Sequence, residues 1–183
     1  MADWGLSVCD DGRVQPRPGG PEILTHSSQG FLVDRAGNRW MGGDITGLYR
    51  ADPEGRLVRF GIAEGLSDIW ITCLLEDREG NLWIGTERGG LNRWTPAPVQ
   101  MLSLEEGLPH PNVWTVAACP TDAHRVWLGT EEGLAVCDGG VVRPVALPRP
   151  LGSPSVRALH TDRMGRLWIG TGIPSSVWPG ASS

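Results

Sequence analysis

The sequence contains no lysine, since all 16 of its basic residues are arginine. A chain without lysine has neither a Schiff-base nucleophile nor the lysine of a Walker-type phosphate loop. The formal net charge of −5 is also of the wrong sign for a nucleic acid or an anionic membrane surface, because both attract basic faces. These absences exclude Schiff-base and P-loop chemistry, and they predict no nucleic-acid partner.

Long apolar runs, metal motifs and catalytic motifs are missing as well. No stretch approaches the ~20 apolar residues of a membrane span, and the first residues lack the basic start and apolar run of a secretory signal. The four histidines are scattered, and the four cysteines form no Cys-x-x-Cys pair. We therefore expect no catalytic residue, no metal, no cofactor and no membrane span in this chain. The compartment stays undecided.

The abundant aromatic residue is tryptophan, with 9 Trp against 2 Phe and 1 Tyr. Trp-x-Gly motifs recur at Trp40, Trp83, Trp127 and Trp168, with separations of 43, 44 and 41 residues. Gly-Leu follows the first three motifs, and no apolar segment shows helical periodicity. A period of about 40 to 50 residues built from short strands is typical of propeller blades. We predict an all-β fold, a β-propeller of four-stranded antiparallel blades, with about four blades here.

Each repeat is expected to contain four strands, a to d, joined by tight turns. An Asp-x-x-Gly turn joins strands a and b in three repeats, and both residue types favour a hairpin. Strand b carries the Trp-x-Gly motif, and we expect all four marker tryptophans in the core. In the third repeat, counting back from Trp127 places residues 121–124 at this turn, which predicts a hairpin of unchanged length with a different turn.

The repeats make residues 1–183 a single propeller segment. The first half blade carries strands c and d, because residues 4–14 resemble residues 132–142, and the last carries strands a and b. The two halves either meet in a closed four-bladed ring or lie at the ends of an open arc. We favour the open arc, whose edges another copy of the chain or the remaining blades of a longer protein would cover. The expected ranges are a half blade at 4–16, blades at 29–61, 69–104 and 112–147, and a half blade at 156–172.

The connections from d to a and from b to c open on the same face of a propeller, where we expect the functional site. Trp70 and Trp114 each stand 13 residues before their marker tryptophan, where the other two repeats have serine. An indole beside arginine and carboxylates suits a sugar ring, which presents C–H patches and hydroxyls together. Packing between blades is the alternative role for both rings. The candidate ligand-binding residues are Trp70, Trp114, Asp68, His110, Asn112, Glu87, Arg88 and Glu131.

The second repeat resembles the two-component regulator propeller repeat. The resemblance rests on Gly65-Leu66-Ser67-Asp68, on Leu74 through Thr86 with its Asp-x-x-Gly turn and Trp-Ile-Gly-Thr core, and on Gly89-Gly90-Leu91-Asn92-Arg93. It covers most of residues 30–171. It implies a β-propeller of the kind found in sensor regions of bacterial hybrid histidine kinases. In that family the propeller lies outside the cytoplasmic membrane and often binds carbohydrate fragments.

The residues and the resemblance together predict a non-enzymatic sensor or ligand-recognition segment of a bacterial signalling protein. Its ligand is expected to be an oligosaccharide or another small molecule. Two alternatives stay open, a structural protein-interaction propeller and, third, a propeller lyase acting on a small cyclic substrate. Binding to a glycan array separates the first two readings, and an assay with cyclic peptides or lactones tests the third.

Overall fold

The computed structural model describes residues 7–10, 13–16, 28–95, 100–147 and 154–172, which form three four-stranded antiparallel sheets and two hairpins. The prediction of an all-β propeller with four-stranded blades is confirmed. The hairpins are β1 (Ser7–Asp10) with β2 (Arg13–Pro16) and β15 (Val156–Thr161) with β16 (Leu167–Thr171). The first two blades are β3 (Ser28–Val33), β4 (Arg39–Gly43), β5 (Gly47–Ala51), β6 (Leu57–Phe60) and β7 (Ile71–Glu76), β8 (Leu82–Thr86), β9 (Leu91–Trp94), β10 (Gln100–Leu102). The third blade is β11 (Val113–Ala118), β12 (Arg125–Thr130), β13 (Gly133–Asp138), β14 (Val141–Val145), and a short 3-10 helix, η2 (Ile62–Glu64), follows β6.

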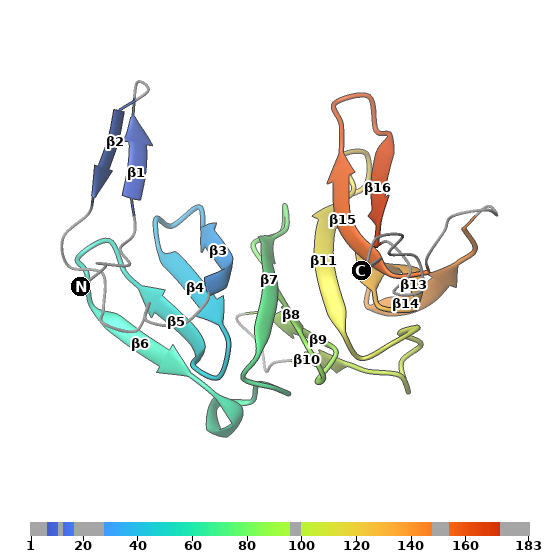
Figure 1. Cartoon of the computed structure of the whole chain (residues 1–183), viewed down its shortest axis with the longest axis horizontal. Helices are drawn as coiled ribbons and strands as arrows, with labels where there is room; N and C mark the ends of the chain where they lie inside the picture. The colour runs from blue at the N-terminus through green and yellow to red at the C-terminus, as the bar shows by residue number, and fades with distance from the viewer. Residues whose placement is uncertain (1–6, 11–12, 17–27, 96–99, 148–153, 173–183) are drawn as a thin grey trace, which may run out of the picture.

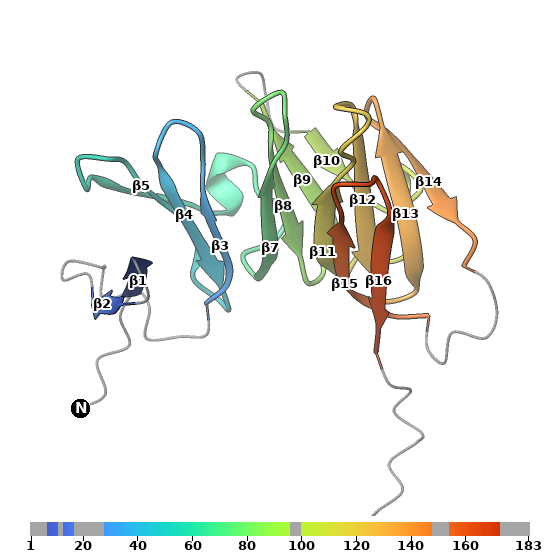
Figure 2. The same cartoon turned by 90° about the horizontal axis from the view of Figure 1, so that it is seen from above.

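The blades are arranged as an open arc. The first strands of consecutive units, β3, β7, β11 and β15, contact one another in that order and line the inner side of the arc (Figure 1). In both views the hairpin β1–β2 lies at one end of the arc and the hairpin β15–β16 at the other (Figure 1, Figure 2). The two end hairpins are separate two-stranded sheets, so they do not pair with each other into one four-stranded blade.

The turn between strands a and b does more than close the hairpin. Asp77 Oδ1 accepts the backbone N–H of Asn81 at 2.8 Å, and Gly80 takes a positive φ of 80°, as expected for this turn. The second oxygen, Oδ2, accepts the indole N–H of Trp83 at 2.7 Å. The same bond joins Trp40 to Asp34 at 2.8 Å and Trp168 to Asp162 at 3.0 Å. The aspartate thus fixes the marker ring, and for the buried rings Trp40 and Trp83 it satisfies an N–H that has little access to water.

The third blade departs from the template in a way that the sequence count misses. Trp83 pairs with Leu75, a separation of 8 residues, whereas Trp127 pairs with Ala117, a separation of 10 residues. The a–b connection of this blade is therefore two residues longer, and the predicted unchanged length is wrong. The turn also differs as expected, because it is closed by a bond from Cys119 N to Arg125 O.

The core lies between blades rather than within them. One buried cluster joins Trp40 and Leu48 of the first blade to Ile71 and Ile84 of the second. Another joins Trp83 of the second blade to residues of the third, including Leu128. Because each sheet buries its face against the next one, every blade depends on its neighbour for stability.

The marker tryptophans are not equally buried, which corrects the expectation that all four lie in the core. Trp40 is 7% exposed and Trp83 is 2% exposed, but Trp168 is 57% exposed. Trp168 nevertheless keeps the hydrogen bond from its indole N–H to Asp162 that the buried rings Trp40 and Trp83 make to their own aspartates. Among the described residues, β16 has no third strand beside it and no following blade on its face, which leaves the ring exposed.

The glycine of the Trp-x-Gly motif supplies a test of packing between blades. A Cβ on Gly42 would lie 2.5 Å from Cβ and Cγ2 of Ile71 in the next blade, which is too close for any contact. We expect Gly42→Ala to lower the free energy of unfolding by about 1 to 3 kcal/mol in denaturant melts, as overpacking does. Gly170→Ala is the matched control, because the nearest atom to its Cβ, at 3.2 Å, belongs to Ala158 in its own hairpin. An equal loss in both variants would contradict the proposed role of the neighbouring blade.

Candidate functional site

The first strand of every unit contains a β-bulge at the same place. The register shifts between Ser28 and Gly30, between Ile71 and Cys73, between Val113 and Thr115, and between Val156 and Ala158. A bulge redirects the side chain of its extra residue, and bulges are common beside binding sites. The extra residue of each bulge lies near the start of strand a, on the inner side of the arc. The d–a and b–c connections lie at this same end of the strands, so the four extra residues of adjacent units stand near these connections. They are Gln29, Thr72, Trp114 and Arg157.

A cleft of about 170 Å³ opens at this end of the strands, and three consecutive blades form its walls. The first blade contributes an amide and a carboxylate, the second contributes an indole, a hydroxyl and a carboxylate, and the third contributes an indole. Two indoles and two carboxylates thus share one small space. The lining residues are Gln29, Asp44, Trp70, Ile71, Thr72, Glu87 and Trp114.

Trp114 is held on one side by polar contacts. Its indole N–H donates to Glu131 Oε2 at 2.6 Å, and the guanidinium Cζ of Arg157 lies 3.9 Å from the ring centroid. Arg157 also forms an ion pair with Glu131 at 3.0 Å, so the three side chains fix one another. A ring fixed in this way loses little side-chain entropy when a ligand contacts it.

Trp70 is positioned by the connection that precedes β7. Its backbone N–H donates to Asp68 Oδ1 at 3.3 Å, and its carbonyl accepts the N–H of Glu87 at 3.0 Å. Asp68 Oδ2 also accepts the backbone N–H of Arg88 at 3.0 Å, which ties the d–a connection to the b–c connection. The Arg88 guanidinium lies 5.5 Å from the Trp70 ring centroid, although the side chain is exposed.

The structure brings together part of the predicted site. Trp70, Trp114 and Glu87 line the same cleft, and Asp68, Arg88 and Glu131 contact these residues or their backbone. His110 accepts the backbone N–H of Asn112 at 3.1 Å through Nδ1, and neither residue lines the cleft. His110 and Asn112 therefore belong to the connection that leads into β11 rather than to the cavity.

Counting from the marker tryptophan gave the wrong equivalence for the two indoles. The longer hairpin of the third blade makes Trp114 the counterpart of Thr72, and makes Trp70 the counterpart of Asn112. The two rings thus come from different repeat positions and face one cleft from adjacent blades. Sequence reasoning missed the bulge residues Gln29 and Arg157, because in the sequence they look like ordinary strand residues. They are identified only from the shift in strand register.

The cleft can form hydrogen bonds as well as apolar contacts. Gln29 donates to Asp44 at 3.0 Å, and Thr72 Oγ1 donates to the carbonyl of Val113. Among the seven lining residues there are two carboxylates and no basic side chain, so a carboxylate-bearing ligand would be repelled. Indole faces with hydrogen-bonding groups at their edges suit a neutral polyhydroxylated ring.

Metal and acid–base chemistry find little support in the described part of the chain. No three His, Cys, Asp or Glu side chains among the described residues form a group that could hold a metal ion. The ion pairs of these residues bring one histidine to a carboxylate, His124 to Glu79 at 2.6 Å. That pair joins two a–b turns, at the opposite end of the strands from the cleft.

No helix in the described ranges is long and apolar enough to cross a membrane.

The family resemblance is confirmed by comparison with known proteins. Residues 65–88 and 150–172 match the sequence model of the family described as Two component regulator propeller. These stretches contain the a–b units of the second blade and of the last hairpin. The chain is therefore a propeller segment that contains repeats of the two-component regulator type. The search of curated proteins found no match.

Solved structures show the same fold. The extracellular domain of BT3049, assigned to a hybrid two component system of B. thetaiotaomicron, matches 79% of this chain and 20% of its own, with 20% identity and TM-score 0.66. The extracellular domain of BT4673 from the same organism matches 80% of this chain, and the match covers 22% of that domain, with 18% identity and TM-score 0.66. Virginiamycin B lyase from Staphylococcus aureus matches 79% of this chain, and the match covers 48% of the lyase, with 18% identity and TM-score 0.61. The chain spans about a fifth of the two extracellular domains, and at these identities the likeness shows the fold alone.

Proposed function

We propose that this chain is the ligand-recognition part of an extracytoplasmic sensor propeller, and that it binds a neutral oligosaccharide, one ring of which occupies the cleft between Trp70 and Trp114. The observation that carries the proposal is that two indoles from adjacent blades line one small cavity with Asp44 and Glu87. The match to the two-component regulator propeller family supports the sensor role. The function is recognition rather than catalysis.

The geometry favours a sugar over a protein partner. Pockets for small ligands are concave, apolar in most of their lining, and contain a few polar groups that fix orientation. The cleft is more polar than that, with three apolar and four polar side chains in its lining, which suits a hydroxylated ring. The Trp114 ring is held by Glu131 and Arg157 rather than free to repack. Such prior ordering raises affinity, because less conformational entropy is lost on binding.

A lyase role has a weaker basis in the structure. It would require a histidine and a carboxylate that meet at the mouth of the arc, within reach of a bound substrate. Of the three described histidines, His110 contacts a backbone amide outside the cleft, and His124 pairs with Glu79 at the far end of the strands. The third, His160, is exposed on β15 and forms no ion pair with a carboxylate of the described residues. The resemblance to virginiamycin B lyase concerns the fold alone.

A glycan array followed by calorimetry with the strongest ligand tests this proposal. We expect neutral oligosaccharides to bind, and Trp114→Ala or Trp70→Ala to weaken binding about tenfold or more, ~1.4 kcal/mol. Trp168→Ala is the matched control, because that indole is 57% exposed and lies outside the cleft. Binding that all three variants retain unchanged, or the absence of any glycan ligand, would contradict the proposal.

A further inference from the structure

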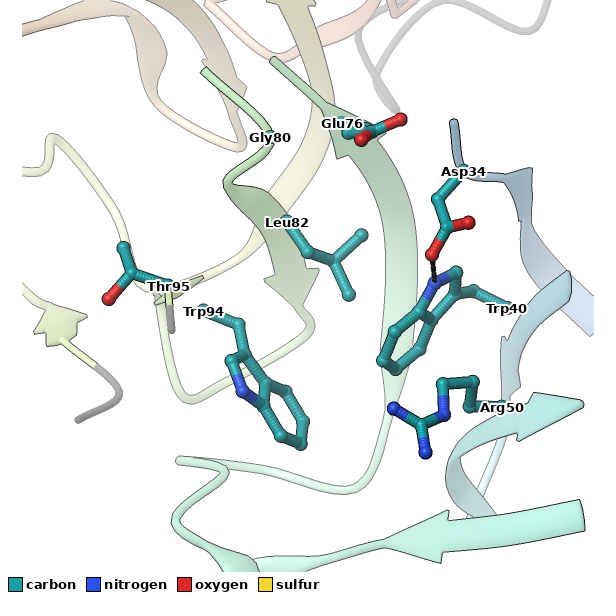
Figure 3. A pocket seen from close by; sticks show the side chains of 8 residues that line it. All are labelled: Asp34, Trp40, Arg50, Glu76, Gly80, Leu82, Trp94 and Thr95. Atoms are coloured by element: carbon teal, nitrogen blue, oxygen red, sulfur yellow. Dashed lines mark hydrogen bonds between the residues drawn. The ribbon is translucent and has the colours of Figure 1, made fainter. Parts of the chain in front are cut away.

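A second cavity, of about 210 Å³, lies between the first and second blades near the a–b turns. Figure 3 shows the indole of Trp40 and the indole of Trp94 on two sides of its opening, with the guanidinium of Arg50 beside Trp40. The two ring centroids are 5.8 Å apart, and Phe60 packs edge-on against Trp94 at 4.4 Å. The cavity is therefore aromatic on two sides and carries one cation.

Arg50 has no anionic partner among the described residues. Its Cζ lies 5.7 Å from the Trp40 ring centroid and 5.8 Å from that of Phe60, so the guanidinium rests on aromatic faces. Its Nε is buried and has no acceptor within the described structure. The Arg50 side chain as a whole is half-buried, and Arg93 in the next blade also has a buried Nε without an acceptor. A partly desolvated guanidinium gains from an ionised acceptor.

The neighbouring blade shows what such an arginine binds. Arg93 occupies the same register position, since Trp83 pairs with Arg93 as Trp40 pairs with Arg50. Its Cζ lies 5.4 Å from the Trp83 ring centroid, and its Nη2 lies 3.9 Å from Glu79 Oε2. Glu79 stands in the Asp-x-x-Gly turn of its own blade.

In the first blade the position of Glu79 is occupied by Ala36. The ring and the arginine are kept, but the carboxylate that completes the arrangement is missing. We infer that the cavity at Arg50 binds a small carboxylate that also carries hydroxyl groups, with a sugar acid as the ligand class. This site is separate from the cleft at Trp70 and Trp114, and it does not depend on the function proposed there.

The two carboxylates in the cavity lining, Asp34 and Glu76, explain why the ligand is expected to carry hydroxyl groups. Both would repel a second negative charge, so the ligand carboxylate must lie at the Arg50 end. Burial acts to raise the pKa of Asp34, but hydrogen bonds from Trp40 and Asn38 outweigh it and hold the pKa below its ordinary value. Asp34 therefore stays ionised at neutral pH, and hydroxyl groups are the ligand donors that suit it. The volume is below the ~300 Å³ of drug-sized sites, which limits the ligand to about one ring.

Titration of glucuronate, glucose and benzoate into the full chain, followed by NMR, tests this inference. We expect glucuronate to bind at least tenfold more tightly than glucose or benzoate, since each of these lacks one part of the ligand. Ala36→Glu should abolish glucuronate binding, because the new carboxylate occupies Arg50 as Glu79 occupies Arg93. Arg50→Gln should weaken binding at least tenfold, and Arg93→Gln, the matched control, should leave it unchanged.

Each other outcome overturns all or part of the inference. Glucuronate binding that survives Ala36→Glu, or equal binding of glucose, would exclude Arg50 as the anion site. Equal binding of benzoate would show that no hydroxyl is read and would overturn the sugar-acid class. Since Ala36 is exposed on a turn, Ala36→Glu is expected to fold, which thermal melts check. Trp70→Ala and Trp114→Ala should leave glucuronate binding unchanged, so failure here and failure at the other cleft are distinguishable.

Discussion

Replacing Trp83 with alanine is expected to lower the free energy of unfolding by about 3 to 5 kcal/mol, as large truncations in a core do. The ring is 2% exposed and belongs to the buried cluster that includes Val126 and Leu128 of the next blade, so its removal leaves a cavity between two sheets. Its loss also removes the indole donor from Asp77, a buried carboxylate. The measurement is a denaturant melt followed by circular dichroism.

The chain itself offers the control for this experiment. Trp168 occupies the same position in the last hairpin and makes the same bond to its aspartate, but it is 57% exposed. Trp168→Ala should therefore cost clearly less than Trp83→Ala, because more than half of the Trp168 surface is already exposed. A loss under 1 kcal/mol for Trp83→Ala, or equal losses for the two variants, would show that burial between blades does not determine stability.

The second large effect concerns association in solution. Within the described ranges no strand pairs with the outer edge of β16 and no blade covers its face, and unpaired edges and exposed apolar faces promote association. We expect the 19.7 kDa chain to self-associate, with a mass that rises toward two chains as the concentration increases. Sedimentation equilibrium at several concentrations gives this mass directly.

A single charge should prevent this association if the face of β16 is the interface. Trp168→Glu places a carboxylate on that face, and we expect the variant to stay monomeric. Met164→Glu is the control, because Met164 is 81% exposed on the a–b turn, away from the edge. A compact monomer of the unaltered chain at every concentration would instead favour closure of the two half blades into one ring.

Repetition made the fold predictable from the sequence. Four copies of Trp-x-Gly and three Asp-x-x-Gly turns determine where the strands lie, because each turn restricts the backbone locally. The count failed at residues 119–125, since a hairpin can lengthen by two residues without disturbing the strands beside it. The exposure of Trp168 could not be read from its motif, because burial depends on which neighbour covers it.

The candidate site was predictable only in part. Trp70, Trp114 and Glu87 were found because indoles and carboxylates near loop ends are visible in any sequence. Gln29 and Arg157 were not found, since a bulge is a property of strand pairing rather than of residue type. The cavity at Arg50 was missed for a related reason. Its distinguishing feature is Ala36, an absence that matters only once Arg93 and Glu79 are seen together.

The central claim is that the cleft lined by Trp70 and Trp114 is where a neutral oligosaccharide binds, and the indole N–H signals of the tryptophans test it most directly. An NMR titration with the strongest glycan from the array, on chain labelled with ¹⁵N, reports every indole separately once variants assign the signals. The account predicts shifts in Trp70 and above all in Trp114, whose N–H is bonded to Glu131 at 2.6 Å, with Trp83 and Trp168 unchanged. Signals of Trp70 and Trp114 that stay still at saturating ligand would contradict it.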